Sequence, residues 1–105
     1  MAGMTRRSVT KWFVYLLRCR DGTLYTGIAK DVTRRCEQHN AGTASRYTRS
    51  RLPVALVYQE SKASQSLALK REAAIKAMSR LEKESLIRQA RRRRRAKSHP
   101  PPKWD

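Results

Sequence analysis

The stretch Lys11–Ala29, KWFVYLLRCRDGTLYTGIA, decides the fold of this chain. Two segments rich in β-branched and aromatic residues lie on either side of Asp21-Gly22. Asp and Gly tolerate the positive φ angles of tight turns, so this pattern predicts a β-hairpin. Each predicted strand contains one tyrosine, Tyr15 in the first and Tyr25 in the second. We therefore expect the hairpin to carry part of a functional site as well as part of the core.

Three strands are predicted. The first, about Trp12–Arg18, is apolar on both faces, which is typical of a strand in the middle of a sheet. The second, about Thr23–Ile28, is mixed and contains Gly27, which leaves space for another group to approach the backbone. A third strand is predicted over Val54–Glu60, directly after Pro53. The simplest sheet places the first strand in the centre.

Capping residues predict a helix soon after the hairpin. Asp31 is a good N-cap, and the segment after it runs to an Asn and a Gly that commonly end helices. We expect a helix over about Val32–Asn40. Residues 41–53 contain Gly, Ser, Thr and three arginines without periodicity, which predicts a basic loop. Its arginines give this loop the charge to contact a phosphate backbone.

Two more helices are predicted after the third strand. Ser64 or Ser66 can cap a helix that ends near Ala77. The inward stripe of this helix is expected to include Leu67, Ala74 and Met78, with Ala68 and Ile75 beside it and Glu72 at its edge. The last helix begins at Ser79, because SRLE from Ser79 to Glu82 matches a capping box.

The composition indicates one small basic domain. Of its 105 residues, 39% are hydrophobic, which suffices for a single small core. The 25 Lys and Arg residues outnumber 8 Asp and Glu residues, and the net charge is +17. Such a charge favours a polyanionic partner, nucleic acid first and an anionic membrane second. We expect a flexible leader over residues 1–11, a domain over 12–90 and a basic, proline-containing disordered tail over 91–105.

Several other classes of protein do not fit the sequence. The only cysteines are Cys19 and Cys36, which indicates a reduced compartment, the cytoplasm, rather than a disulfide framework. The sequence contains no Cys-x-x-Cys motif and no Cys/His cluster, so a zinc site is not expected. The longest apolar run, Trp12 to Leu17, is far shorter than the roughly 20 residues of a spanning helix. We expect no transmembrane segment.

Five polar residues stand out by their order along the predicted elements. Arg35 and His39 are four residues apart and project from one face of the first helix. Tyr15 lies in FVYLL, Tyr25 begins a Tyr-x-Gly sequence, and Glu72 lies on a later helix. This combination resembles the GIY-YIG nuclease family, in particular its small single-domain bacterial members of uncharacterised function.

The resemblance extends over Trp12–Ile87. It implies an α+β fold of order ββαβαα, in which a three-stranded antiparallel sheet with strand one central is flanked by about three helices. It also implies cleavage of nucleic-acid phosphodiester bonds with one divalent ion, Mg²⁺ or Mn²⁺. The expected substrate is DNA, including branched, damaged or single-stranded DNA, and RNA remains an alternative.

The resemblance also implies roles for the five polar residues. Glu72 would hold the metal ion. Arg35 would neutralise charge that develops on the phosphoryl oxygens, for which a planar guanidinium is well suited. Either Tyr15 or Tyr25 would orient or deprotonate the attacking water, with help from His39. The sequence leaves the choice between the two tyrosines open.

Three features depart from the family pattern. The last predicted helix and the tail contain no asparagine, although homing-endonuclease relatives use one downstream. Gly-Ile-Tyr is replaced by Phe13-Val14-Tyr15, which keeps the tyrosine. Ile28 stands where several relatives have a lysine, and Lys30 is the candidate to replace it. The basic residues expected to contact nucleic acid are Lys30, Arg34, Arg46, Arg49, Arg51, Arg91, Arg92 and Arg93.

Each of these residues also has an ordinary structural interpretation. The tyrosines are common in the cores of sheets, and Arg35 with His39 could form a solvated helix face. Glu72 could simply pair with Lys76, four residues later. Two further functional hypotheses remain beside the endonuclease. One is a nucleic-acid-binding module that keeps the fold without turnover, and the other is a tail that anchors the protein to an anionic membrane or a ribosome.

Overall fold

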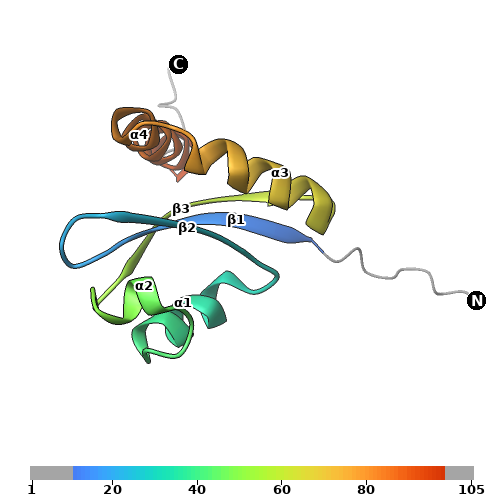
Figure 1. The fold of residues 1–105 in the computed structure, drawn as a ribbon. Coiled ribbons are helices and arrows are strands. Elements are labelled where there is room, and N and C mark those ends of the chain that lie inside the picture. The colour runs from blue at the N-terminus through green and yellow to red at the C-terminus, as the bar shows by residue number, and fades with distance from the viewer. Residues whose placement is uncertain (1–10, 99–105) are drawn as a thin grey trace, which may run out of the picture.

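The computed structural model describes residues 11–98, and it describes side chains up to residue 95. In chain order the elements are β1 (Trp12–Arg18), β2 (Leu24–Ala29), α1 (Val32–Asn40), α2 (Arg46–Arg49), β3 (Ala55–Lys62), α3 (Gln65–Lys76) and α4 (Arg80–Ser98). Figure 1 shows the sheet between two helical layers, with α1 and α2 on one face and α3 and α4 on the other. The fold is therefore α+β, as predicted.

The sheet has the strand order β2-β1-β3, and both pairings are antiparallel. The apolar strand β1 is central, which confirms the prediction made from its two apolar faces. β2 and β3 are the edge strands. In the β1–β2 pairing Tyr15 lies opposite Gly27, and Leu17 lies opposite Tyr25. This register places both tyrosines on the face that carries α1.

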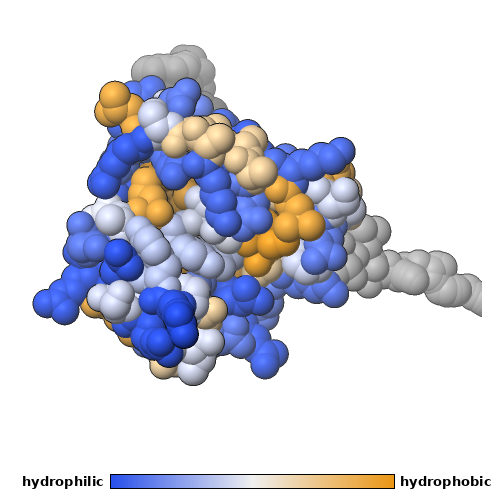
Figure 2. All heavy atoms as spheres, in the orientation of Figure 1, coloured by the Kyte–Doolittle hydropathy of each residue, from blue (hydrophilic) through white to orange (hydrophobic). Residues whose placement is uncertain are grey.

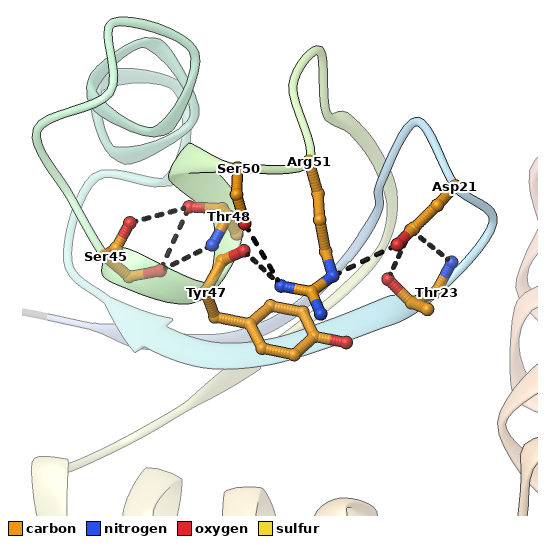
Figure 3. Close-up of polar contacts among 7 residues, drawn as sticks. All are labelled: Asp21, Thr23, Ser45, Tyr47, Thr48, Ser50 and Arg51. Atoms are coloured by element: carbon orange, nitrogen blue, oxygen red, sulfur yellow. Dashed lines mark hydrogen bonds and ion pairs between the residues drawn. The ribbon is translucent and has the colours of Figure 1, made fainter.

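The hairpin turn forms where Asp21-Gly22 predicts it. Gly22 has φ 87°, a left-handed conformation that favours glycine. The Asp21 carboxylate accepts hydrogen bonds from the amide of Thr23 at 3.1 Å and from its hydroxyl at 2.7 Å (Figure 3). An Asx-type turn of this kind stabilises the tight connection between β1 and β2.

The long helices begin at the residues that their capping signals indicate. The Asp31 carboxylate accepts the amide of Arg34 at 3.0 Å at the start of α1. Ser64, one of the two candidates, caps α3. Before α4, the Ser79 amide donates to the Glu82 carboxylate at 2.8 Å, and the Glu82 amide donates to the Ser79 hydroxyl at 3.1 Å. The predicted capping box is thus complete.

Two segments differ from the prediction. Residues 41–53 were expected to be a loop throughout, but they include the single-turn helix α2, capped by Ser45. One turn is too short to show a helical period in the sequence. The arginine stretch after residue 90, expected to be disordered, continues α4 to Ser98, and arginine is a good helix former. The leader, apart from Lys11, and residues 99–105 of the tail lie outside the described residues.

Each face of the sheet has its own core cluster. The buried residues on the α1 face are Tyr15, Leu17, Cys19, Ala29, Val32 and Val54. Those on the α3 and α4 face are Val14, Leu16, Ala68, Ile75 and Ile87. Both cysteines are free. Within residues 11–98, no helix has the length and apolar character that crossing a membrane requires.

The inward stripe of α3 differs from the prediction by one position. Ala68 and Ile75 are fully buried, whereas Leu67 is 47% exposed and Ala74 is exposed. The small Ala68 side chain allows α3 to pack closely on the sheet. Glu72 is four residues after Ala68 and three before Ile75, so it lies on their face of the helix rather than at its edge. Glu72 is therefore on the side of α3 that packs on the sheet.

Candidate active site

Tyr15 lies at the centre of the candidate site because Gly27 makes room for it. The Tyr15 side chain is 1% exposed, and it projects from β1 across β2. A Cβ atom added to Gly27 would lie 2.6 Å from the Tyr15 hydroxyl oxygen, closer than any real contact. Only glycine therefore allows the phenol to pass over this edge strand. The Tyr15 phenol occupies the space that the missing side chain of Gly27 leaves beside the backbone.

His39, in the last turn of α1, meets the Tyr15 hydroxyl. Its Nε2 atom is 3.1 Å from that oxygen, and its side chain is 1% exposed. Its Nδ1 atom lies 2.7 Å from the hydroxyl oxygen of Thr48. The Tyr25 ring packs edge-on against the imidazole, with ring centroids 5.0 Å apart. The two tyrosines and the histidine thus form one contiguous group.

Thr48 and Ser45 belong to this group but were missed in the sequence. The Thr48 side chain is fully buried, and its hydroxyl lies 3.0 Å from the Ser45 hydroxyl (Figure 3). The Thr48 amide donates to the same Ser45 oxygen at 3.1 Å, which is the N-cap bond of α2. A serine three residues before a threonine is the spacing of such a cap. That spacing is the signal that could have identified α2.

A stack of side chains fixes α2 against the hairpin. The Tyr47 ring lies 5.9 Å from the Tyr25 ring, between centroids, and the Arg51 guanidinium carbon lies 3.9 Å from the Tyr47 ring. Arg51 also donates to the Asp21 carboxylate at 3.1 Å and to the Tyr47 carbonyl at 2.8 Å (Figure 3). Arg51 was expected to contact nucleic acid, but its guanidinium here links α2 to the β1–β2 turn.

Arg35 approaches the same group from α1. Its Nε atom donates to the Gln38 side chain at 3.1 Å, and its charge acts on the Tyr15 hydroxyl. A cavity of about 290 Å³ adjoins Arg35, and its cationic lining residues are Lys30, Arg34 and Arg35. Lys30 also lies over the ring of Trp12, at 5.3 Å from the centroid. The cavity combines three cationic side chains and an aromatic wall with one acidic residue, Asp31.

Glu72 lies on α3, in the opposite layer, and acts on the group through its charge. Its carboxylate pairs with Lys76 at 3.3 Å, and 18% of its side chain is exposed. Although α1 and α3 cover opposite faces, β2 is an edge strand, and the Glu72 charge still acts on the Tyr15 hydroxyl. The pair with Lys76 predicted as the structural interpretation is present. It does not remove Glu72 from the electrostatic environment of Tyr15.

The electrostatics of the group follow from burial. Burial, together with the neighbouring Tyr25 and Glu72, raises the pKa of Tyr15 to about 12, and Arg35 acts in the opposite direction. Burial and the charge of Arg35 lower the pKa of His39. At neutral pH the phenol therefore keeps its proton and the imidazole is neutral. The Tyr15 phenol can therefore donate a proton, and the His39 imidazole can accept one.

The residues present fit a divalent ion that arrives together with its substrate. Among residues 11–95 no cluster of three or more His, Cys, Asp or Glu side chains could enclose a metal ion. Mg²⁺ usually keeps several waters and is bound through one or two carboxylates plus substrate phosphates. Glu72, with its partly exposed carboxylate, can provide one such ligand. A fully enclosed protein cage is not required.

The expected nucleic-acid-binding residues fall into three regions. Lys30 and Arg34 line the cavity beside Arg35. Arg46 and Arg49 are exposed on α2. Apart from Arg51, described above, the others are Arg91, Arg92 and Arg93, which are exposed on α4, in the layer across the sheet from α1 (Figure 1). Figure 2 shows hydrophilic side chains over much of this face, with pale and hydrophobic side chains among them.

Comparison with known proteins places the chain in a family. A family model described as the GIY-YIG catalytic domain matches residues 11–85. A UPF0213 protein of Staphylococcus aureus is 53% identical over 77 residues, which is 73% of this chain and 94% of that protein. The solution NMR structure of the UPF0213 protein BH0048 from Bacillus halodurans has a TM-score of 0.50 at 39% identity, and the match covers 75% of this chain and 84% of that one.

A second NMR structure, of the protein EF2693 from E. faecalis, has a TM-score of 0.54 at 35% identity, with 77% of this chain and 86% of that chain covered. The family-model match extends over both tyrosines, Arg35, His39 and Glu72. The chain belongs to the GIY-YIG family.

Proposed function

We propose that this protein is a metal-dependent endonuclease that hydrolyses phosphodiester bonds in nucleic acid, with DNA as the expected substrate. One observation carries the proposal. The buried Tyr15 hydroxyl lies against His39 Nε2 and within the electrostatic influence of Arg35 and Glu72, although these residues come from three different elements. Tyr15 and His39 are buried, and burial of polar groups is costly unless they are hydrogen-bonded, as these two are to each other.

The two charged residues would have different roles, one at the phosphate and the other at the metal ion. Arg35 would bind the scissile phosphate and stabilise the negative charge that grows on its oxygens. Glu72 would hold Mg²⁺ or Mn²⁺, which when bound supplies Lewis-acid polarisation of the phosphate. Lys76, which now pairs with Glu72 at 3.3 Å, is exposed and can turn towards solvent when a cation is bound. Its partner would then be free to act as a ligand.

Tyr15 is the better candidate for activating water, because it has a proton acceptor beside it. A phenol with a pKa of about 12 is almost entirely protonated at neutral pH, so by itself it is a poor base towards water. The neutral His39 Nε2, 3.1 Å away, can accept the phenol proton while the phenol oxygen takes one from water. The hydroxide oxygen then bonds to phosphorus as the bond to the leaving oxygen breaks, and the leaving oxygen takes a proton from solvent. Tyr25, packed on His39, would position the water.

The basic side chains would hold the nucleic-acid backbone on both sides of this group. The cavity lined by Lys30, Arg34 and Arg35 would take a phosphate next to the scissile one. Arg46 and Arg49 on α2 would contact the strand further along. Contacts of this kind are made to phosphates and do not read base sequence. Because they release counterions from the nucleic-acid backbone, the affinity should fall steeply as salt rises.

A nicking assay tests the proposal. Purified protein is incubated with plasmid, single-stranded, branched and RNA substrates in Mg²⁺, in Mn²⁺ and in a chelator. We expect metal-dependent cleavage of at least one substrate, and loss of cleavage with retained binding in Glu72→Gln. Glu37→Gln, at an exposed carboxylate of α1, is the matched control and should cleave normally. Salt-dependent binding without any cleavage would instead support the binding module, and cleavage by Glu72→Gln at the normal rate would overturn the role of Glu72.

A further inference from the structure

We propose that Thr48, supported by Ser45, is a positioning residue that holds the neutral His39 ring with its proton on Nδ1, so that Nε2 is always free to accept the Tyr15 proton. The structural part of this inference concerns the ring itself. Its catalytic consequence rests on the proposed nuclease function. The observations that carry it are a continuous chain of polar contacts from Ser45 to Tyr15.

The chain of contacts is buried along most of its length. Thr48, His39 and Tyr15 are each no more than 1% exposed. The successive distances are 3.0 Å from the Ser45 hydroxyl to the Thr48 hydroxyl, 2.7 Å from there to His39 Nδ1, and 3.1 Å from Nε2 to the Tyr15 hydroxyl. Among residues 11–95 no buried side-chain nitrogen or oxygen lacks a partner. Each buried polar atom of this chain therefore has at least one hydrogen-bond partner.

The donors and acceptors at both ends of the imidazole, Tyr15 at Nε2 and Thr48 at Nδ1, together favour one tautomer. Tyr15 keeps its proton, because burial makes its ionisation costly, and its hydroxyl interacts with Arg35 and with His39 Nε2 at 3.1 Å. The Arg35 guanidinium can only donate, so Nε2 is the acceptor for the Tyr15 proton. Nε2 therefore accepts, and in a neutral imidazole the proton then lies on Nδ1. Nδ1 donates to the Thr48 oxygen. The Thr48 proton in turn has two acceptors on Ser45, its hydroxyl at 3.0 Å and its carbonyl oxygen at 3.4 Å.

The fold holds Thr48 in place independently of α1. Ser45 caps α2 through the Thr48 amide at 3.1 Å. Arg51, one turn later, ties α2 to the β1–β2 turn through Asp21. The hydroxyl that meets His39 is therefore anchored to the same hairpin that carries Tyr15 (Figure 3). A partner placed in this way limits both the rotation of the imidazole ring and the location of its proton.

The arrangement also prepares for the proton that His39 receives. When the Tyr15 proton moves to Nε2, the imidazolium has a proton on each nitrogen, and Nδ1–H keeps the same acceptor, the Thr48 oxygen. No side chain has to rotate during the transfer. The opposite tautomer, with the proton on Nε2, would donate to the Tyr15 oxygen and could not accept its proton.

The tautomer can be measured without any nuclease assay. Long-range ¹⁵N correlation spectra of the His39 ring at neutral pH distinguish a protonated nitrogen from an unprotonated one. In the wild type we expect a single form with the proton on Nδ1. In Thr48→Val, which removes the hydroxyl at nearly constant volume, we expect that single form to be lost, and Thr48→Ser should restore it. Thr33→Val, at an exposed threonine of α1, should leave the spectrum unchanged.

A wild-type ring protonated on Nε2, or a Thr48→Val ring indistinguishable from the wild type, would overturn the inference. On the substrate that the wild type cleaves, we expect Thr48→Val to lower kcat roughly 10- to 100-fold, by analogy with the partners that orient metal-binding histidines, with KM unchanged and activity restored in Thr48→Ser. An unchanged kcat would show that Thr48 does not act in catalysis. A wild type that cleaves nothing would instead defeat the nuclease proposal, while the ring spectra would still decide the tautomer.

Discussion

The two faces of β1 bury their side chains equally well but with different chemistry. Leu16, on the α3 and α4 face, is fully buried among Ala68, Ile75 and other apolar side chains. Its neighbour Tyr15 is 1% exposed on the α1 face, yet its hydroxyl is bonded to His39. Burial of apolar atoms is favourable in itself, whereas burial of polar atoms requires partners. The α3 and α4 face of β1 therefore contributes mainly stability, whereas the α1 face carries the polar groups of the proposed site.

The largest expected effect is on stability and falls on the apolar face. Leu16→Ala should lower the free energy of unfolding by about 2–5 kcal/mol, because it leaves a cavity against α3. Tyr15→Phe keeps the ring and should cost only about 1–3 kcal/mol, since it leaves one nitrogen of His39 without its hydrogen bond. Urea unfolding of both variants measures the difference. Equal losses would break the contrast between the two faces.

Gly27→Ala tests the close approach of Tyr15 to β2. The new Cβ atom would lie 2.6 Å from the Tyr15 hydroxyl, so the ring must move. We expect a loss of about 1–3 kcal/mol in unfolding free energy, as for other overpacked sites, and displaced ring resonances of Tyr15 and His39. Tyr15→Phe combined with Gly27→Ala should lose less than the sum of the two. Unshifted His39 resonances in Gly27→Ala would contradict the geometry.

The smallest expected effect is the pH dependence of stability due to His39. Burial, reinforced by Arg35, lowers the pKa of His39 from its usual 6.5 in the folded state. As the pH falls below about 6.5 the unfolded chain binds a proton that the folded protein does not, so stability decreases with falling pH. Urea unfolding between pH 7.5 and about 5 measures this slope. His39→Gln should flatten it, and an unchanged slope in that variant would assign the effect to other groups.

The sequence was sufficient where the structural signal is local. The Asp21-Gly22 turn, the Asp31 cap and the capping box at Ser79 each depend on a few neighbouring residues, and all three form as predicted. The central place of β1 followed from its two apolar faces. The helix α2 was missed because a single turn has no period, and with it Thr48, whose importance depends on its contact with His39.

The juxtaposition of Glu72 with Tyr15 could not be predicted from spacing alone. The two residues are far apart in the chain and belong to elements that border opposite faces of the sheet. The prediction also placed Leu67 inward on α3, whereas the buried positions are Ala68 and Ile75. Hydrophobic size favoured leucine, but the close packing of helix on sheet favoured alanine. Only this one-position correction turns Glu72 towards the sheet.

The most direct test of the account compares metal-dependent nicking by the wild type, Tyr15→Phe and Leu16→Ala, at a temperature where all three are folded by circular dichroism. We predict that the wild type nicks DNA only with Mg²⁺ or Mn²⁺, that Tyr15→Phe loses this activity despite its smaller loss of stability, and that Leu16→Ala keeps most of it per folded molecule. Normal nicking by Tyr15→Phe, or no metal-dependent nicking by the wild type, would contradict the claim that the α1 face of β1 is a catalytic site.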